Sequence, residues 1–134
     1  MKLRLRGNSL RLRLTKTEIS TLRDEGCWQD ATSLGTPEGS RLVYRVETAE
    51  LEKPAVNFTS GTETVITVAM PVAEVLTWAN SSQVGISFET PWGLKVAVEK
   101  DFQCLDPLRD EDESDNFDNP NAGDNQHGVC HADD

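Results

Sequence analysis

Basic and apolar residues alternate along the start of the chain. A period of two is typical of a β-strand with one apolar face and one charged face. Gly7 and Asn8 interrupt the alternation, and both residue types favour the positive φ angles of a tight two-residue turn. The pattern therefore predicts a β-hairpin with leucines on one face and cations on the other. The leucines are Leu3, Leu5, Leu10, Leu12 and Leu14, and the cations are Lys2, Arg4, Arg6, Arg11 and Arg13.

The numbering of these residues also predicts the register of the hairpin. A two-residue turn places Leu5 opposite Leu10 and Arg4 opposite Arg11, so that like side chains share a face. A loop one residue longer would place cations opposite leucines and mix the two faces. We therefore expect the shorter turn.

Two helices are expected in the body of the chain. Thr15 and Glu18 have the spacing of a capping box, and Gly26 suits the left-handed conformation that ends a helix. Pro71 begins the second helix, because the missing N–H of proline is tolerated in the first turn. One face of this helix is apolar, with Val72, Val75, Leu76 and Ala79 on it.

Strand patterns fill the rest of the body and give the chain an internal repeat. Strands are predicted at residues 27–34, 40–48, 65–70, 83–90 and 93–100, with a further hairpin turn at Ser60-Gly61. When Leu10 is aligned with Ile66, Leu22 falls on Trp78, and both halves read strand–strand–helix–strand–strand. A duplicated unit explains this match, and so does coincidence between antiparallel segments. The predicted fold class is α+β, mainly antiparallel, with about eight strands in a curved sheet or barrel and two helices.

Charge divides the chain into two parts. Residues 1–100 hold equal numbers of acidic and basic residues, whereas residues 101–134 hold 11 acidic residues and a single basic residue, Arg109. The net charge of -10 therefore lies in the last quarter, which also has few large apolar residues. We predict one α+β domain over residues 1–103 and an acidic C-terminal extension, the acidic tail, over residues 104–134, partly docked or disordered.

The cations of the hairpin form the first candidate site. Charges on a strand most often face water, and that is one interpretation. Like charges on adjacent strands repel each other, so a nearby anion would stabilise the hairpin, and guanidinium groups suit phosphate or carboxylate. The chain's own acidic run at residues 110–115 is an attached candidate. The residues predicted to bind an anionic ligand or an acidic protein segment are Lys2, Arg4, Arg6, Arg11 and Arg13.

The acidic tail contains the second candidate site, for a metal ion. Both histidines and two of the three cysteines of the chain fall there, and four nitrogen and sulfur ligands are the number that structural zinc requires. Adjacent Cys and His side chains seldom reach one tetrahedral ion, so a tail that binds no metal is the alternative. The candidate ligands are Cys104, His127, Cys130 and His131, and no cofactor other than zinc is predicted.

Several classes of protein are not expected. The chain has no nucleophile elbow, phosphate loop or dinucleotide fingerprint, and its body lacks a histidine as general base. Nucleic acid is disfavoured as a partner, because a net charge of -10 repels phosphate backbones. No apolar run has the length of a signal peptide or a membrane span, which favours a cytoplasmic protein. The oligomeric state is left open.

A barrel of two similar halves with inward cations would resemble the triphosphate-tunnel enzymes, which implies metal-assisted hydrolysis of triphosphates. That family begins with a strand of alternating glutamates and a lysine, whereas residues 2–6 carry no carboxylate. No catalytic residue is therefore assigned. A phosphohydrolase would need a cluster of carboxylates, for which Glu47, Glu50 and Glu99 are the candidates.

Residues 2–15, 78–85, 98–106 and 111–120 carry motifs that resemble a family of small uncharacterised bacterial proteins. The resemblance implies an ordered docking segment at residues 111–120 with Phe117 as its apolar anchor, but no activity, substrate or cofactor. Our functional interpretation is a non-catalytic binding module whose basic hairpin is regulated or neutralised by its acidic tail. The alternatives are a metal-stabilised interaction protein and a phosphohydrolase of the triphosphate-tunnel kind.

Overall fold

The computed structural model describes residues 1–35 and 40–102, and Met1–Asp101 forms one compact unit. Eight strands and two helices lie in this described part of the chain. In chain order they are β1 (Lys2–Arg6), β2 (Ser9–Leu14), α1 (Lys16–Glu25), β3 (Cys27–Ser33), β4 (Arg41–Ala49), β5 (Ala55–Thr59), β6 (Glu63–Pro71), α2 (Val72–Ala79), β7 (Gly85–Glu89) and β8 (Lys95–Lys100). Neither helix is long and apolar enough to span a membrane.

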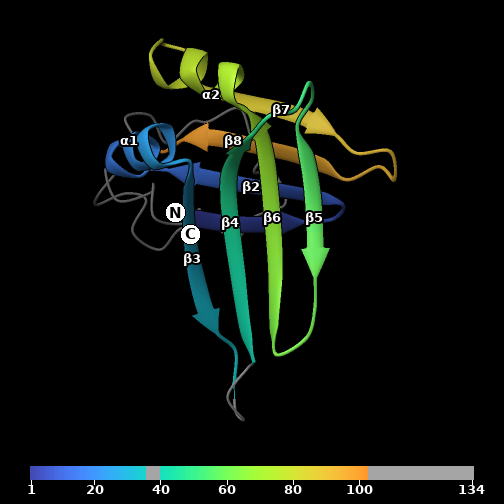
Figure 1. Ribbon diagram of the computed structural model, residues 1–134. Helices are drawn as coiled ribbons and strands as arrows, with labels where there is room; N and C mark the ends of the chain where they lie inside the picture. The colour runs from blue at the N-terminus through green and yellow to red at the C-terminus, as the bar shows by residue number, and fades with distance from the viewer. Residues whose placement is uncertain (36–39, 103–134) are drawn as a thin grey trace, which may run out of the picture. The chain divides into compact units, whose positions relative to one another are not determined.

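The strands form two four-stranded sheets (Figure 1). The first sheet has the order β1-β2-β8-β7 and the second has the order β3-β4-β6-β5. In each sheet the two central strands are parallel and the two outer pairs are antiparallel. The predicted α+β class, with its strands, two helices and mainly antiparallel pairing, is confirmed. The curved sheet or barrel takes the form of two mixed sheets that are not closed into a barrel.

The internal repeat is confirmed at the level of topology. The hairpin β1–β2 from the first half pairs with β8 and β7 from the second half, and the hairpin β5–β6 pairs with β4 and β3 from the first half. Exchanging the two halves therefore converts one sheet into the other. Each sheet is made of strands from both halves, so neither half can complete a sheet alone.

The hairpin has the predicted register. Leu5 pairs with Leu10 and Arg4 pairs with Arg11 across β1 and β2. Gly7 in the turn has a φ of 55°, the left-handed region that glycine adopts without a steric penalty. The period-two alternation of the sequence was therefore sufficient to align these two strands.

The core lies between the two sheets and beneath the helices. In Figure 1 the strands of the second sheet run across those of the first, the arrangement of orthogonally packed sheets. Side chains from both sheets share one buried cluster, to which α1 and α2 add their apolar faces. The cluster comprises Leu10, Leu12, Leu14, Ile19, Leu22, Val46, Val68, Met70, Val75, Trp78, Ile86, Val96 and Val98.

Helix α1 begins and ends where the sequence predicts. The Thr15 side chain accepts a hydrogen bond from the Glu18 backbone N–H, and the Glu18 side chain accepts one from the Thr15 N–H. Gly26 ends the helix in the left-handed conformation with a φ of 89°. Both ends are thus determined by local hydrogen bonds and backbone preference.

The predicted apolar face of α2 is buried only in part. Val75 is buried, but Val72 and Leu76 are 41% and 42% exposed. Trp78 takes their place, is fully buried, and donates a hydrogen bond from Nε1 to the Val84 carbonyl at 3.1 Å. The helix is apolar on nearly every side, so its hydrophobic pattern did not determine which side would face the sheets.

Substitutions on α2 test this orientation. Replacing Trp78 with alanine leaves a cavity in the core and is expected to lower the free energy of unfolding by about 3–5 kcal/mol. Replacing the exposed Leu76 with alanine is expected to cost less than about 1 kcal/mol, because little apolar area is lost. Urea unfolding of both variants measures the difference. Equal losses would mean that Leu76 belongs to the core.

The amino group of Met1 lies between two carboxylates. It donates hydrogen bonds to Oε2 of Glu18 and, at 2.9 Å, to Oδ2 of Asp30. Glu18 belongs to the first turn of α1 and Asp30 to β3, so this contact connects β1 to both elements. Burial lowers the pKa of the amino group, but the hydrogen bonds and charges of the two carboxylates outweigh it and raise the pKa above its usual 8.0.

The raised pKa predicts that stability falls in alkaline solution. The unfolded chain loses this proton near the usual pKa, so the stabilisation is complete below about pH 8 and is lost as the pH rises through the higher pKa of the folded state. We expect the melting temperature to fall as the pH rises above about 8, and to fall less steeply in Asp30→Asn. Glu25→Gln, at an exposed position on α1, is the control. Identical pH slopes in all three proteins would contradict the assignment.

Candidate functional site

All the cations of the predicted anion site lie on one face of the β1–β2 hairpin. Leu10, Leu12 and Leu14 are buried in the core, so the alternating cations of β2 project from the opposite side of the sheet. The register places the cations of β1 beside them. The cations therefore face away from the core and do not line a lumen. We call this surface the basic face; it comprises Lys2, Arg4, Arg6, Arg11 and Arg13.

The parallel pairing of β2 with β8 extends the basic face across the first sheet. Ala97 lies beside Arg11, and Glu99 lies beside Arg13. On the next strand, Ser87 pairs with Ala97 and Gly85 pairs with Glu99. The register therefore defines rows of side chains across the outer side of the sheet, and two neighbouring rows contain most of the basic face. The first row contains Lys2, Arg13, Glu99 and Gly85, and the second contains Arg4, Arg11, Ala97 and Ser87.

Carboxylates of β8 and of the residue that follows it partly neutralise the basic face. Oε1 of Glu99 lies 3.5 Å from Nε of Arg11 and 3.7 Å from Nε of Arg13. Oδ2 of Asp101 lies 3.4 Å from Nζ of Lys2. The side chains of Glu99 and Arg13 are only 26% and 17% exposed, so solvent screens their attraction less than at an open surface. Sequence reasoning did not place these carboxylates beside the hairpin.

Gly85 makes room for Glu99. A Cβ at this position would lie 2.7 Å from the Val98 carbonyl oxygen and 2.9 Å from Cγ of Glu99, both closer than side-chain carbons approach in proteins. The missing side chain lets Glu99 lie over β7 while its carboxylate reaches the arginines. Gly85 is therefore a positioning residue for the carboxylate of the site.

Replacing Gly85 with alanine is expected to lower the free energy of unfolding by roughly 1–3 kcal/mol, because the new methyl group forces the strand or Glu99 to move. Gly61→Ala is the matched control: no atom lies within 4 Å of a Cβ built there. Its effect is expected to stay within about 0.5 kcal/mol. Urea unfolding measures both variants. A Gly85→Ala protein as stable as the control would mean that the close approach is not required.

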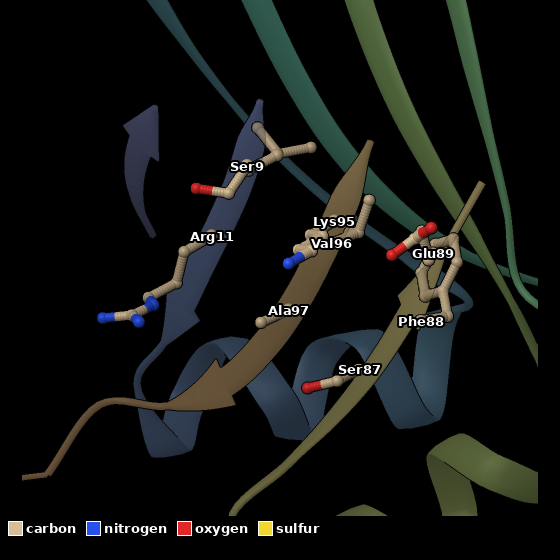
Figure 2. A pocket seen from close by; sticks show the side chains of 9 residues that line it. Ser9, Arg11, Ser87, Phe88, Glu89, Lys95, Val96 and Ala97 are labelled. Carbon is tan, nitrogen blue, oxygen red and sulfur yellow. The ribbon is translucent and has the colours of Figure 1, made fainter. Parts of the chain in front are cut away.

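A shallow depression of about 500 Å³ lies on the outer side of the first sheet (Figure 2). Its polar side chains come from three adjacent strands, with Arg11 on β2, Lys95 on β8, and Ser87 and Glu89 on β7. The small side chain of Ala97 lies between β2 and β7 and leaves the space open. The depression is lined by Ser9, Leu10, Arg11, Ser87, Phe88, Glu89, Lys95, Val96 and Ala97.

The cations on β4 of the second sheet have close carboxylate partners. Nη1 of Arg41 lies 3.1 Å from Oε2 of Glu63, and Nε of Arg45 donates a hydrogen bond to Oε1 of Glu47 at 2.8 Å. On β4 each arginine thus lies beside a different carboxylate, whereas on the first sheet the carboxylate of Glu99 lies within 4 Å of both Arg11 and Arg13. The two sheets share a topology but differ in charge, and the first sheet has the excess of cations.

The predicted zinc ligands, Cys104, His127, Cys130 and His131, lie outside the described residues. Within residues 1–35 and 40–102, no group of three or more His, Cys, Asp or Glu side chains is arranged to hold a metal ion. Of the carboxylates named for a phosphohydrolase, Glu99 lies on the first sheet and Glu47 on the second, while Glu50 follows β4. The described structure does not gather them into one cluster.

Fold and surface together define an α+β protein of two mixed sheets with a cationic outer face. Residues 1–121 match the model of a family of unknown function, DUF7009, and the chain belongs to that family. The match confirms the resemblance to an uncharacterised family. Comparison with curated proteins and with solved structures gave no match.

Proposed function

We propose that the protein is a non-catalytic binding module whose basic face holds an anionic partner or ligand, and whose acidic tail occupies or competes for that face. The observation that supports this proposal is the register of the hairpin, which brings five cations to one side of two adjacent strands. A bacterial, cytoplasmic setting goes with the proposal as a prediction.

Repulsion within the basic face favours an anion there. Arg4 lies directly opposite Arg11, and Lys2 lies opposite Arg13, so two cross-strand pairs of like charge occur side by side. Such pairs destabilise a sheet. Glu99 lies near two of these cations, and an anionic ligand would likewise offset the repulsion through charge-assisted hydrogen bonds to the guanidinium groups.

The acidic tail is a source of such an anion within the same chain. The run at residues 110–115 holds five carboxylates, and its attachment to the same chain raises its local concentration at the basic face. The family match extends to residue 121 and therefore includes this run together with the hairpin. A tail that competes for the face also disfavours nucleic acid as the partner, because it repels phosphate backbones.

Neutralising the acidic run tests the proposal in the full-length chain. One variant changes Asp110, Glu111, Asp112 and Glu113 to the corresponding amides. We expect it to bind polyphosphate at least about tenfold more tightly than the parent at low salt, with affinity that falls as salt is added. Titration calorimetry at two salt concentrations measures the change.

A control variant that loses the same number of charges distinguishes competition by the tail from a general effect of the net charge. It changes four exposed carboxylates of the body, Glu25, Glu50, Glu52 and Glu74, to glutamine. This control is expected to gain less than about threefold in affinity, since distant surface charges are screened. Equal gains in the two variants would show that the tail has no special relation to the basic face. Absence of binding by either variant would overturn the proposed anion site.

A further inference from the structure

The row of side chains that crosses the depression has no carboxylate at its central position, unlike the neighbouring row. Glu99 occupies that position in the first row, between Arg13 and Gly85, whereas Ala97 occupies it in the second row, between Arg11 and Ser87. Adjacent strands are about 4.8 Å apart, so the backbones of Arg11 and Ser87 are separated by roughly 10 Å across the methyl group of Ala97. A ligand group of about the size of a carboxylate or phosphate fits this space.

The side chains around the space are mainly hydrogen-bond donors. Arg11 offers a guanidinium group, Lys95 an ammonium group and Ser87 a hydroxyl group, each from a different strand. In Figure 2 the hydroxyl of Ser87 points toward the side of Ala97, and Arg11 and Lys95 belong to the two neighbouring strands. Ser9 also lines the depression, and its hydroxyl donates to the Arg6 carbonyl at 2.6 Å.

We propose that this depression binds the phosphoryl group of a small phosphorylated molecule, with Arg11, Ser87 and Lys95 as its donors. The inference rests on the proposed anion-binding function and assigns it a ligand class. Three donors on three strands match a tetrahedral phosphoryl group, which presents three oxygens in different directions. A carboxylate presents two oxygens in one plane, which suits the single fork of one arginine better.

Glu89 limits which phosphorylated molecules fit. It lines the depression on β7 and lies opposite Lys95 in the register. A second phosphoryl group placed there would be repelled, whereas a hydroxyl or amino group of the ligand would donate to this carboxylate. The site therefore favours monophosphates that carry a hydrogen-bond donor at their other end. A volume of about 500 Å³ lies within the usual range for small-molecule sites.

Glu99 competes with the ligand for Arg11. Its carboxylate already lies 3.5 Å from Nε of that arginine, in a position for which the missing side chain of Gly85 leaves room. A phosphoryl group must share or displace this contact, which reduces the affinity of the native site. Removing the charge at residue 99 should therefore tighten phosphate binding. The loss of a carboxylate near the basic face acts in the same direction.

The test fills the depression without changing any charge. Ala97→Leu places an isobutyl group between Arg11 and Ser87, and inorganic phosphate and a phosphomonoester, phosphoserine, are titrated against the full-length chain by heteronuclear NMR. We expect at least about tenfold weaker binding than in the parent protein. Ala31→Leu, an exposed position on β3, is the control and is expected to leave binding within about twofold.

Two further measurements separate this inference from the proposed function. Glu99→Gln is expected to tighten phosphate binding by about three- to tenfold, and Ser87→Ala to weaken it by a similar factor. Polyphosphate binding by the variant with the neutralised tail should change by less than about twofold when Ala97→Leu is added, because a long polyanion spans the whole basic face.

The outcomes are distinct. Phosphate affinity that is unchanged by Ala97→Leu would overturn the depression as the site, even if polyphosphate still binds the basic face. Loss of polyphosphate binding in Ala97→Leu would overturn the separation of the two sites. Acetate is titrated in the same way. Equal affinities of the protein for inorganic phosphate and for acetate would show that the depression does not select a phosphoryl group. Absence of polyphosphate binding in every variant would instead contradict the proposed function itself.

Discussion

The parallel pairing of β2 with β8 is the contact on which the rest of the structure depends. It joins the β1–β2 hairpin at the start of the chain to β8, the last strand of the body. In the second sheet, the equivalent pairing joins β4 to the β5–β6 hairpin. Each of these two pairings joins strands from the two halves of the chain into one sheet. The pairing of β2 with β8 also brings the polar residues of β8 next to the cations of β2, so the contact that completes the first sheet also completes the candidate site.

The alternation of side chains along β2 links the position of the basic face to that of the core. Every second residue of β2 is a buried leucine, and the residues between them are the cations or Ser9. A shift of one residue in the register would carry the leucines to the outer side and bury the charges, at a cost far above the stability of a domain. The hydrophobic core therefore fixes the cations in place even though they repel each other.

Local features of the sequence predicted local structure well. The alternation around Gly7 gave the hairpin register, and Thr15, Glu18 and Gly26 gave both ends of α1, because hydrogen bonds between near neighbours decide these features. The division of the strands into two sheets was not predictable, since parallel pairing joins residues that are far apart in the chain. For the same reason Glu99 was named as a carboxylate of interest but could not be placed beside Arg11 and Arg13.

The two outer faces differ in charge, and this difference is the basis for the proposed binding role of the first sheet. The second sheet places Glu47 at the position that corresponds to Glu99, and there the neighbouring arginine has its own carboxylate. In the first sheet the carboxylate of Glu99 lies within 4 Å of two arginines, and the adjacent row has Ala97 at the central position. Cross-strand pairs of cations and open space thus occur at the same place. Neither feature stabilises a fold, which is the physical reason for proposing a binding function on this face.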